Sequence, residues 1–376
     1  MWFPSCVSDK NAGSSVLNKT ERFEQMKSVI DAAHKSNNLV GRDSFSVTDI
    51  LEEFLKDTLK AKKETIREFE EYCQEALNAI IRSQEIITSQ AEANTNLLSL
   101  FRTLALLARV RPELIVKDVE LLCKFLSNQE QAGGVWSKEQ SEMIGTVATI
   151  YDCVLPHVQD PPELLIKYLM QDLPMLIQYA PTLPLLTISV KCLCTMVKSV
   201  GSSGRCAEKM YKVVQYFFAQ QTNRLKDPQF KAKPKALMVA GLFCRFSDFQ
   251  LNLKSGKVSA IEDAKVREVF EKCINEYVSH ESLTFKRAGF ACLGSLFVRI
   301  PRLIQLKEVQ HVLSEAFENS SEDIRSLAVT ALTDFVGEDM SDTNATSLRN
   351  SIMQKFLDNI LNCVYCKKDE TAAAAL

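Results

Sequence analysis

The sequence predicts an all-α fold of the HEAT/armadillo helical-repeat type, a solenoid (α-α superhelix) of stacked helix pairs. Six segments carry apolar residues at offsets 0, 3, 4, 7, 8 and 11, which form one face of a helix. Their starts are separated by 46, 42, 50, 50 and 39 residues, close to the HEAT and armadillo period of roughly 40–47 residues. Glycine is scarce, at 12 residues, which disfavours a turn-rich sheet protein.

The clearest copy of this apolar template runs from Ile324 to Phe335, and close copies begin at Leu97 and Phe285. The looser copies begin at Met143, Leu185 and Lys235. In a stacked array each such face packs on the neighbouring repeats and leaves a long surface for partners. The pattern therefore favours binding over catalysis.

The chain before the first template segment has a different pattern. We expect an irregular segment over residues 1–20 and a helical lead-in over 21–91, with helices at 21–35 and 47–60 and a long charged helix at 62–89. Stacked HEAT-like pairs then follow over 92–366, before a disordered tail over 367–376.

Within the stacked region each template helix alternates with a second helix. We expect these second helices near 113–127, 161–179, 205–224, 261–279 and 302–318. The last helix, at 346–365, still has an apolar face, so we expect a further repeat to follow and the chain to be part of a longer protein.

Residues 320–325 (Ser-Ser-Glu-Asp-Ile-Arg) resemble the start of the second helix of a HEAT repeat. Ala328 and Ala331 are small and would permit a close approach between helices. We expect Arg325 to lie along the seam between repeats and to pair with an acid of the neighbouring repeat.

Composition limits the classes of partner and the compartment. The formal net charge is −2, so any nucleic-acid contact must come from a local patch. Several of the 12 cysteines fall inside apolar helical runs, where a free thiol acts as a small hydrophobe, and no secretory signal begins the chain. The longest uncharged run, 173–190, contains three prolines, which argues against a membrane span. A reducing cytosol or nucleus fits best.

The sequence shows none of the familiar catalytic or metal-binding patterns. Residues 201–204 lack the lysine of a phosphate-binding loop, and the four histidines (His34, His157, His280 and His311) are far apart and expected in loops or at the surface. Cys363 and Cys366 have the C-x-x-C spacing but no second pair to complete a zinc site. We expect no enzyme, no metal and no cofactor.

Residues 224–257 carry eight basic and two acidic residues, a net charge of +6 in a chain whose remainder carries −8. Lysines in a loop can each neutralise a phosphate without reading sequence, although the stretch could equally be a solvated connector. Arg245 lies among phenylalanines, so we assign it a structural role and expect it to be largely buried and paired with Asp248. The candidate DNA contacts are Arg224, Lys226, Lys231, Lys233, Lys235, Lys254 and Lys257.

The chain resembles the cohesin loader (Nipped-B-like or adherin) family over roughly residues 2–345. The most specific match is residues 241–249, in which Cys244, Arg245, Asp248 and Phe249 fit a Leu-Cys-Arg-x-x-Asp-Phe segment. Supporting matches are Trp-Phe-Pro at 2–4, Arg-Pro-Glu-Leu-Ile-Val-Lys at 111–117, Lys-Pro-Lys-Ala-Leu at 233–237 and Phe-Ala-Cys-Leu-Gly at 290–294. The tract before Lys235 is more basic than this family's pattern, and the alanine-rich tail has no counterpart in it.

This resemblance implies a nuclear HEAT-repeat hook that helps to load cohesin onto chromatin for sister chromatid cohesion in the cell cycle. It implies binding to double-stranded DNA, to the cohesin SMC heads and to the kleisin, while the ATPase activity belongs to cohesin. The small helical-repeat partner of the loader would bind outside this segment. A HEAT-repeat scaffold of the transport-receptor or phosphatase type remains the alternative.

Overall fold

The structure is a computed structural model that describes residues 19–40, 52, 56, 63–85, 90–116, 122, 138–158, 163–200, 207–247, 258–337 and 343–364. Every regular element in these residues is a helix, and none of them is a β-strand. The predicted all-α helical-repeat class is confirmed. The chain divides into two compact units, and the described residues up to Val200 lie in the first and those from Ala207 in the second.

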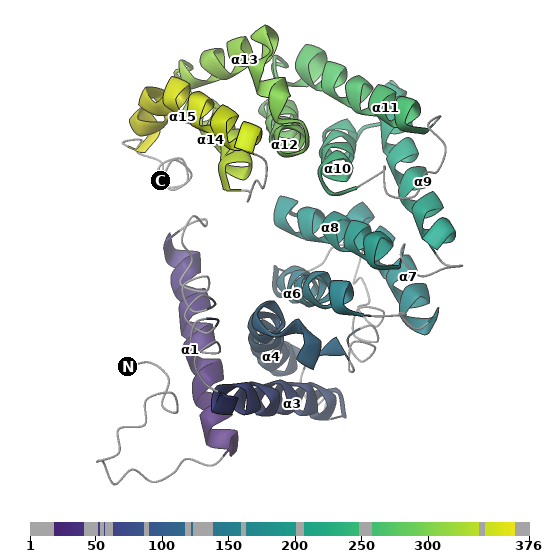
Figure 1. The fold of residues 1–376 in the computed structure, drawn as a ribbon, viewed down its shortest axis with the longest axis vertical. Helices are drawn as coiled ribbons and strands as arrows, with labels where there is room; N and C mark the ends of the chain where they lie inside the picture. The colour runs from purple at the N-terminus through teal and green to yellow at the C-terminus, as the bar shows by residue number, and fades with distance from the viewer. Residues whose placement is uncertain are drawn as a thin grey trace. The chain divides into compact units, whose positions relative to one another are not determined.

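The first unit contains a row of packed helices with further helices against its sides (Figure 1). Its helices are α1 (Lys19–Val40), α3 (Lys63–Glu85), α4 (Gln90–Val110), α6 (Lys138–Val154), α7 (Glu163–Tyr179) and α8 (Leu183–Val200). Helix α4 packs on α6 and α6 on α8, which makes the row. Helix α7 packs on α8, whereas α1 and α3 pack on α4.

The second unit repeats this arrangement. Its helices are α9 (Ala207–Lys226), α10 (Lys233–Phe246), α11 (Val258–Lys272), α12 (Leu283–Arg299), α13 (Lys307–Phe317), α14 (Glu322–Gly337) and α15 (Thr343–Val364). Helices α10, α12 and α14 form the row, with α9 and α11 packed on α10 and with α13 and α15 packed on α14. A π-helical turn, Cys273–Tyr277, continues α11 and packs on α12.

The six apolar templates coincide with α4, α6, α8, α10, α12 and α14, the helices that form the two rows. Their central positions are buried, as Leu104, Leu293 and Leu332 illustrate. The expected second helices coincide with α7, α9, α13 and, including its π-helical turn, α11. Four of the expected segments lie wholly or mainly outside the described residues. They are the helices at 113–127 and 47–60, the irregular start over 1–20 and the tail over 367–376.

Small residues bring the helices of the second row close together, as Ala328 and Ala331 predicted. A Cβ atom added to Gly294 of α12 would lie 3.0 Å from the backbone oxygen of Ala331 on α14. A Cβ atom added to Gly241 of α10 would lie 3.0 Å from Cα of Cys292 on α12. A larger residue at either glycine would therefore meet backbone.

Arg325 makes local contacts in the turn before α14, and its expected pairing with an acid of the neighbouring repeat stays a prediction. Its Nη1 donates hydrogen bonds to the carbonyl oxygens of Asn319 and Ser320, at 2.7 and 3.1 Å, and its Nη2 lies 3.8 Å from a carboxylate oxygen of Glu322. These contacts hold the turn before α14. The guanidinium thus satisfies two carbonyl groups of the segment that joins α13 to α14.

The described cysteines are free thiols, and most are buried, in agreement with the predicted role as small apolar residues. Burial raises the pKa of Cys73 to about 12, so this side chain stays protonated. Among the described residues, we find no helix with the length and apolar character that a bilayer crossing requires.

The expected apolar face of the last helix is partly used within the second unit. Ile352, Phe356 and Ile360 of α15 are buried, and the Phe356 ring packs 5.5 Å from that of Phe317 on α13. Leu357 and Leu361, one turn apart on the same helix, are exposed.

Candidate nucleic-acid interface

The turn that joins α9 to α10 is built by the sequence Asp227-Pro228-Gln229-Phe230. Aspartate followed by proline is typical of the first two positions of a β-turn. The Asp227 carboxylate accepts the backbone N–H of Gln229 at 2.9 Å, and the Asp227 carbonyl accepts that of Phe230 at 3.3 Å. Local chemistry therefore fixes where the chain leaves α9.

Aromatic side chains attach this turn to α9 and also join α9 to α10. The Arg224 guanidinium lies over the Phe230 ring, 5.2 Å from its centre, and donates to the side-chain oxygen of Gln221 at 3.4 Å. Between the helices, the rings of Phe218 and Phe243 meet edge to face at 6.4 Å. Arg224 is thereby held at the turn by a cation–π contact.

The structure separates the predicted basic residues by their availability to phosphate. Lys231 is exposed in the turn, and Lys233 is half-buried at the first position of α10. Lys235 is also half-buried, and this burial lowers the pKa of its ammonium group. Lys226 has its ammonium 2.9 Å from the Glu268 carboxylate on α11. Lys231 and Lys233 are therefore the best placed for phosphate, and Lys254 and Lys257 lie outside the described residues.

The start of α10 adds positive potential beside these two lysines. Ala232 occupies the N-cap position and makes no side-chain hydrogen bond to the first turn. The N–H groups at a helix start carry partial positive charge and attract anions. Lys231 and Lys233 flank this position, so the lysines and the helix dipole act on an incoming phosphate in the same direction.

The residues of the family motif near Arg245 are structural where they are described. Cys244 is buried in α10, and the half-buried Arg245 guanidinium lies 5.0 Å from the centre of the Phe246 ring. Most of the Arg245 side chain is buried, as the sequence suggested, and its stacking on Phe246 fits a structural role. Asp248 and Phe249 lie outside the described residues, so the Arg245–Asp248 pair stays a prediction.

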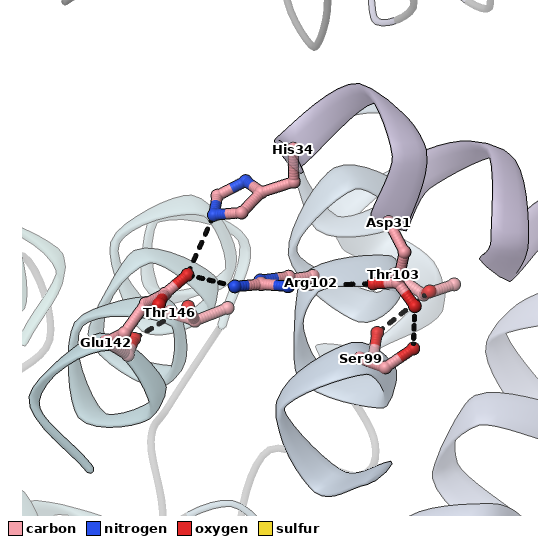
Figure 2. A network of polar contacts seen from close by, with 7 residues as sticks. All are labelled: Asp31, His34, Ser99, Arg102, Thr103, Glu142 and Thr146. Atoms are coloured by element: carbon pink, nitrogen blue, oxygen red, sulfur yellow. Dashed lines mark hydrogen bonds and ion pairs between the residues drawn. The ribbon is translucent and has the colours of Figure 1, made fainter. Parts of the chain in front are cut away.

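A polar network in the first unit has no counterpart among the predicted sites (Figure 2). Arg102 of α4 lies between Asp31 of α1 and Glu142 of α6, forming a short contact with Glu142 and lying 3.8 Å from Asp31. His34 of α1 joins Glu142 through its Nε2 at 2.8 Å, and the Ser99 hydroxyl donates to Asp31 at 2.5 Å. We call these five residues the α1 clasp, because they tie α1 to α4 and α6.

The α1 clasp favours the charged form of the Glu142 carboxylate. The pKa of Glu142 is lowered from 4.5 to about 2, first through the hydrogen bond with His34 and then through Arg102, against the opposing effect of burial. A depressed carboxylate pKa is typical of a structural ion pair, whereas a general acid needs a raised one. The expectation that His34 lies in a loop or at the surface is met only in part, because His34 lies on α1 with 31% of its side chain exposed.

The clasp could not be found from the sequence because its hydrogen bonds join residues that are 40 to 108 positions apart. The available signal was Arg102, a charged residue within a strongly apolar template helix. Among the described residues, no three His, Cys, Asp or Glu side chains are grouped as a metal site would require.

Comparison with known proteins gives a consistent result at low identity. No family model matches the sequence. The chain is similar to Nipped-B proteins. It is 22% identical to the Nipped-B protein of Drosophila melanogaster over 99% of this chain and 19% of that protein. It is 23% identical to Nipped-B-like protein A of Danio rerio over 81% of this chain and 13% of that protein.

The human Nipped-B-like protein shows 21% identity over 89% of this chain and 12% of its own length. The chain therefore spans a fifth or less of these relatives. These similarities to Nipped-B proteins support the resemblance that the sequence motifs indicated.

Proposed function

We propose that this chain is a segment of a cohesin-loading factor of the Nipped-B type, and that it acts by binding rather than by catalysis. Similarity across 81–99% of the chain and the stacked helix pairs support this assignment. The segment would work in the nucleus, on chromatin, in sister chromatid cohesion. Because it spans a small part of its relatives, it would supply a binding surface to a larger loader.

The binding surface that we propose for double-stranded DNA is the α9–α10 turn. The observation that carries this proposal is the placement of Lys231 and Lys233 beside the uncapped start of α10. Two cations and a helix dipole can neutralise backbone phosphates and release counterions, without contacting base edges. The site would therefore bind duplexes of any sequence.

Charge reversal at these two lysines tests the DNA proposal. We expect the Lys231→Glu/Lys233→Glu variant to bind a labelled duplex about tenfold more weakly, or worse, because two attractive contacts become repulsive. The matched control is Lys198→Glu/Lys307→Glu, which changes two exposed lysines on α8 and α13 and alters net charge equally. Fluorescence anisotropy at one salt concentration compares them, and equal losses would show that only total charge matters.

We further propose that the segment contacts the cohesin SMC heads and kleisin, and that the ATPase it influences resides in cohesin. The small helical-repeat partner of the loader would bind elsewhere. A pull-down of purified SMC heads and kleisin by this chain, with and without DNA, tests these contacts. If the chain retains neither the SMC heads nor the kleisin, with or without DNA, the proposed cohesin partners are contradicted. The DNA proposal is tested independently by the anisotropy measurement.

A further inference from the structure

Helix α9 has two opposite faces with different chemistry. Val214, Phe218 and Leu225 are buried toward the core of the second unit. Tyr216 and Asn223 lie on the other side of the helix, and both are exposed. A helix with this pattern leaves its outer face for solvent or for a partner.

The outer face of α9 is hollowed into an open groove of about 340 Å³. The residues that line it are Tyr216, Ala219, Gln220, Asn223, Arg224 and Asp227. The small side chain of Ala219 leaves space between larger neighbours. We call this hollow the α9 groove.

Tyr216 gives the α9 groove an aromatic anchor. Its side chain is 65% exposed, and its ring stands edge to face with that of Phe217, 6.1 Å away. Exposed tyrosines provide a large contact area at low entropic cost, and they are enriched among the residues that dominate binding energy at protein interfaces.

The polar groups of the groove suit a polypeptide. Gln220 and Asn223 carry amides that can donate to and accept from a peptide backbone. Arg224 is already held over Phe230, so its guanidinium can bind a carboxylate with little further loss of freedom. The Asp227 carboxylate accepts one hydrogen bond from the N–H of Gln229, and it can accept another from a peptide N–H group.

The charges around the groove favour an acidic occupant. Arg224 lies in the lining and can pair with a carboxylate, while Asp227 in the same lining can accept an N–H group. A nucleic-acid strand would bring its phosphates against the Asp227 carboxylate. A peptide can avoid that repulsion, because it places carboxylates and N–H groups separately.

We propose that the α9 groove docks an acidic, amphipathic peptide segment of a partner protein. An apolar or aromatic side chain of that segment packs on Tyr216, and an aspartate or glutamate binds Arg224. This inference rests on Tyr216 and Arg224, whereas the DNA proposal rests on Lys231 and Lys233. Either proposal can fail without the other.

A displayed library of short random peptides, selected on the full chain, supplies the probe. We expect the selected peptides to combine acidic residues with Phe, Tyr or Leu. A fluorescein-labelled selected peptide should bind the Tyr216→Ala variant about tenfold more weakly, as expected for loss of an aromatic anchor. The matched control is Tyr179→Ala on α7, where another tyrosine is 45% exposed, and it should bind normally.

A second variant tests the acidic preference. Arg224→Gln should bring the affinity for the acidic peptide down to that of the same peptide with Asn and Gln in place of its acids. Unchanged circular dichroism melting shows that the variants fold. The proposal is overturned if the unchanged chain and the Tyr216→Ala chain select the same peptides, or if the selected peptides are basic. It is also overturned if a single-stranded oligonucleotide, and no peptide, binds through Tyr216.

Discussion

The two units build their rows of helices from one apolar template but fasten them differently. In the first unit, the α1 clasp uses two carboxylates, an arginine and a histidine to hold α1 on α4 and α6. In the second unit, Gly241 and Gly294 let α10, α12 and α14 approach to backbone contact. The template therefore specifies which face is buried, while individual residues such as Arg102 and Gly241 decide how the helices are held together.

The largest effect should come from filling the close approach in the second unit. Gly241→Val should destabilise the chain by about 3 kcal/mol, because its side chain would meet Cys292, whose Cα lies 3.0 Å from the added Cβ. Urea unfolding measures the loss. Amide hydrogen exchange should show protection falling in α10 and α12 and staying normal in α4 and α6.

Gly145 in α6 provides the matched control for this prediction. An added Cβ atom there would lie 3.6 Å from Cδ1 of Leu185, an ordinary contact. Gly145→Ala should therefore be neutral or stabilise the chain by up to about 1 kcal/mol, since alanine favours helix. Similar losses at Gly145 and Gly241 would remove the distinction between the units.

The next effect concerns the α1 clasp. Arg102→Met should destabilise the chain by about 2 kcal/mol, because it leaves the Asp31 and Glu142 carboxylates partly buried without their shared cation. Hydrogen exchange should show α1 losing protection first. The control is Arg67→Met on α3, whose side chain is 83% exposed beside Glu71, and its effect should lie near zero. An Arg102→Met chain as stable as this control would make the clasp irrelevant to folding.

The smallest effect is a dependence on pH. The folded-state pKa of Glu142 is about 2, below its ordinary 4.5, so its contribution is present above that ordinary value and is lost as pH falls through 4.5 toward 2. Allowing for solvent screening, the contribution is about 1 kcal/mol. Urea unfolding near pH 5 and near pH 3 should show a smaller decrease for Glu142→Gln than for the unchanged chain. Parallel decreases would mean that Glu142 is not held by His34 and Arg102.

Local patterns predicted most of the architecture. The template positions around Leu104 and Phe335 repeat within one helix, so a single sequence displays the face that must be buried. The basic turn was also visible, because Asp227-Pro228 and the following lysines are adjacent in the chain.

Contacts between distant residues could not be predicted in the same way. Asp31, His34 and Glu142 meet only after α1 packs on the row, and nothing local marks them as partners. The loss of hydration that lowers the pKa of Lys235 likewise depends on packing, since nothing in the local sequence marks this lysine. The α9 groove depends on which face of α9 turns outward.

The salt dependence of duplex binding tests the central claim, that Lys231 and Lys233 neutralise phosphates. The affinity of the unchanged chain and of the Lys231→Ala/Lys233→Ala variant should be measured at several salt concentrations. We predict that the slope of log K against log salt concentration becomes shallower by about two units in the variant, roughly one for each phosphate that a lysine no longer neutralises. An unchanged slope would contradict the claim and leave this turn as a solvated connector.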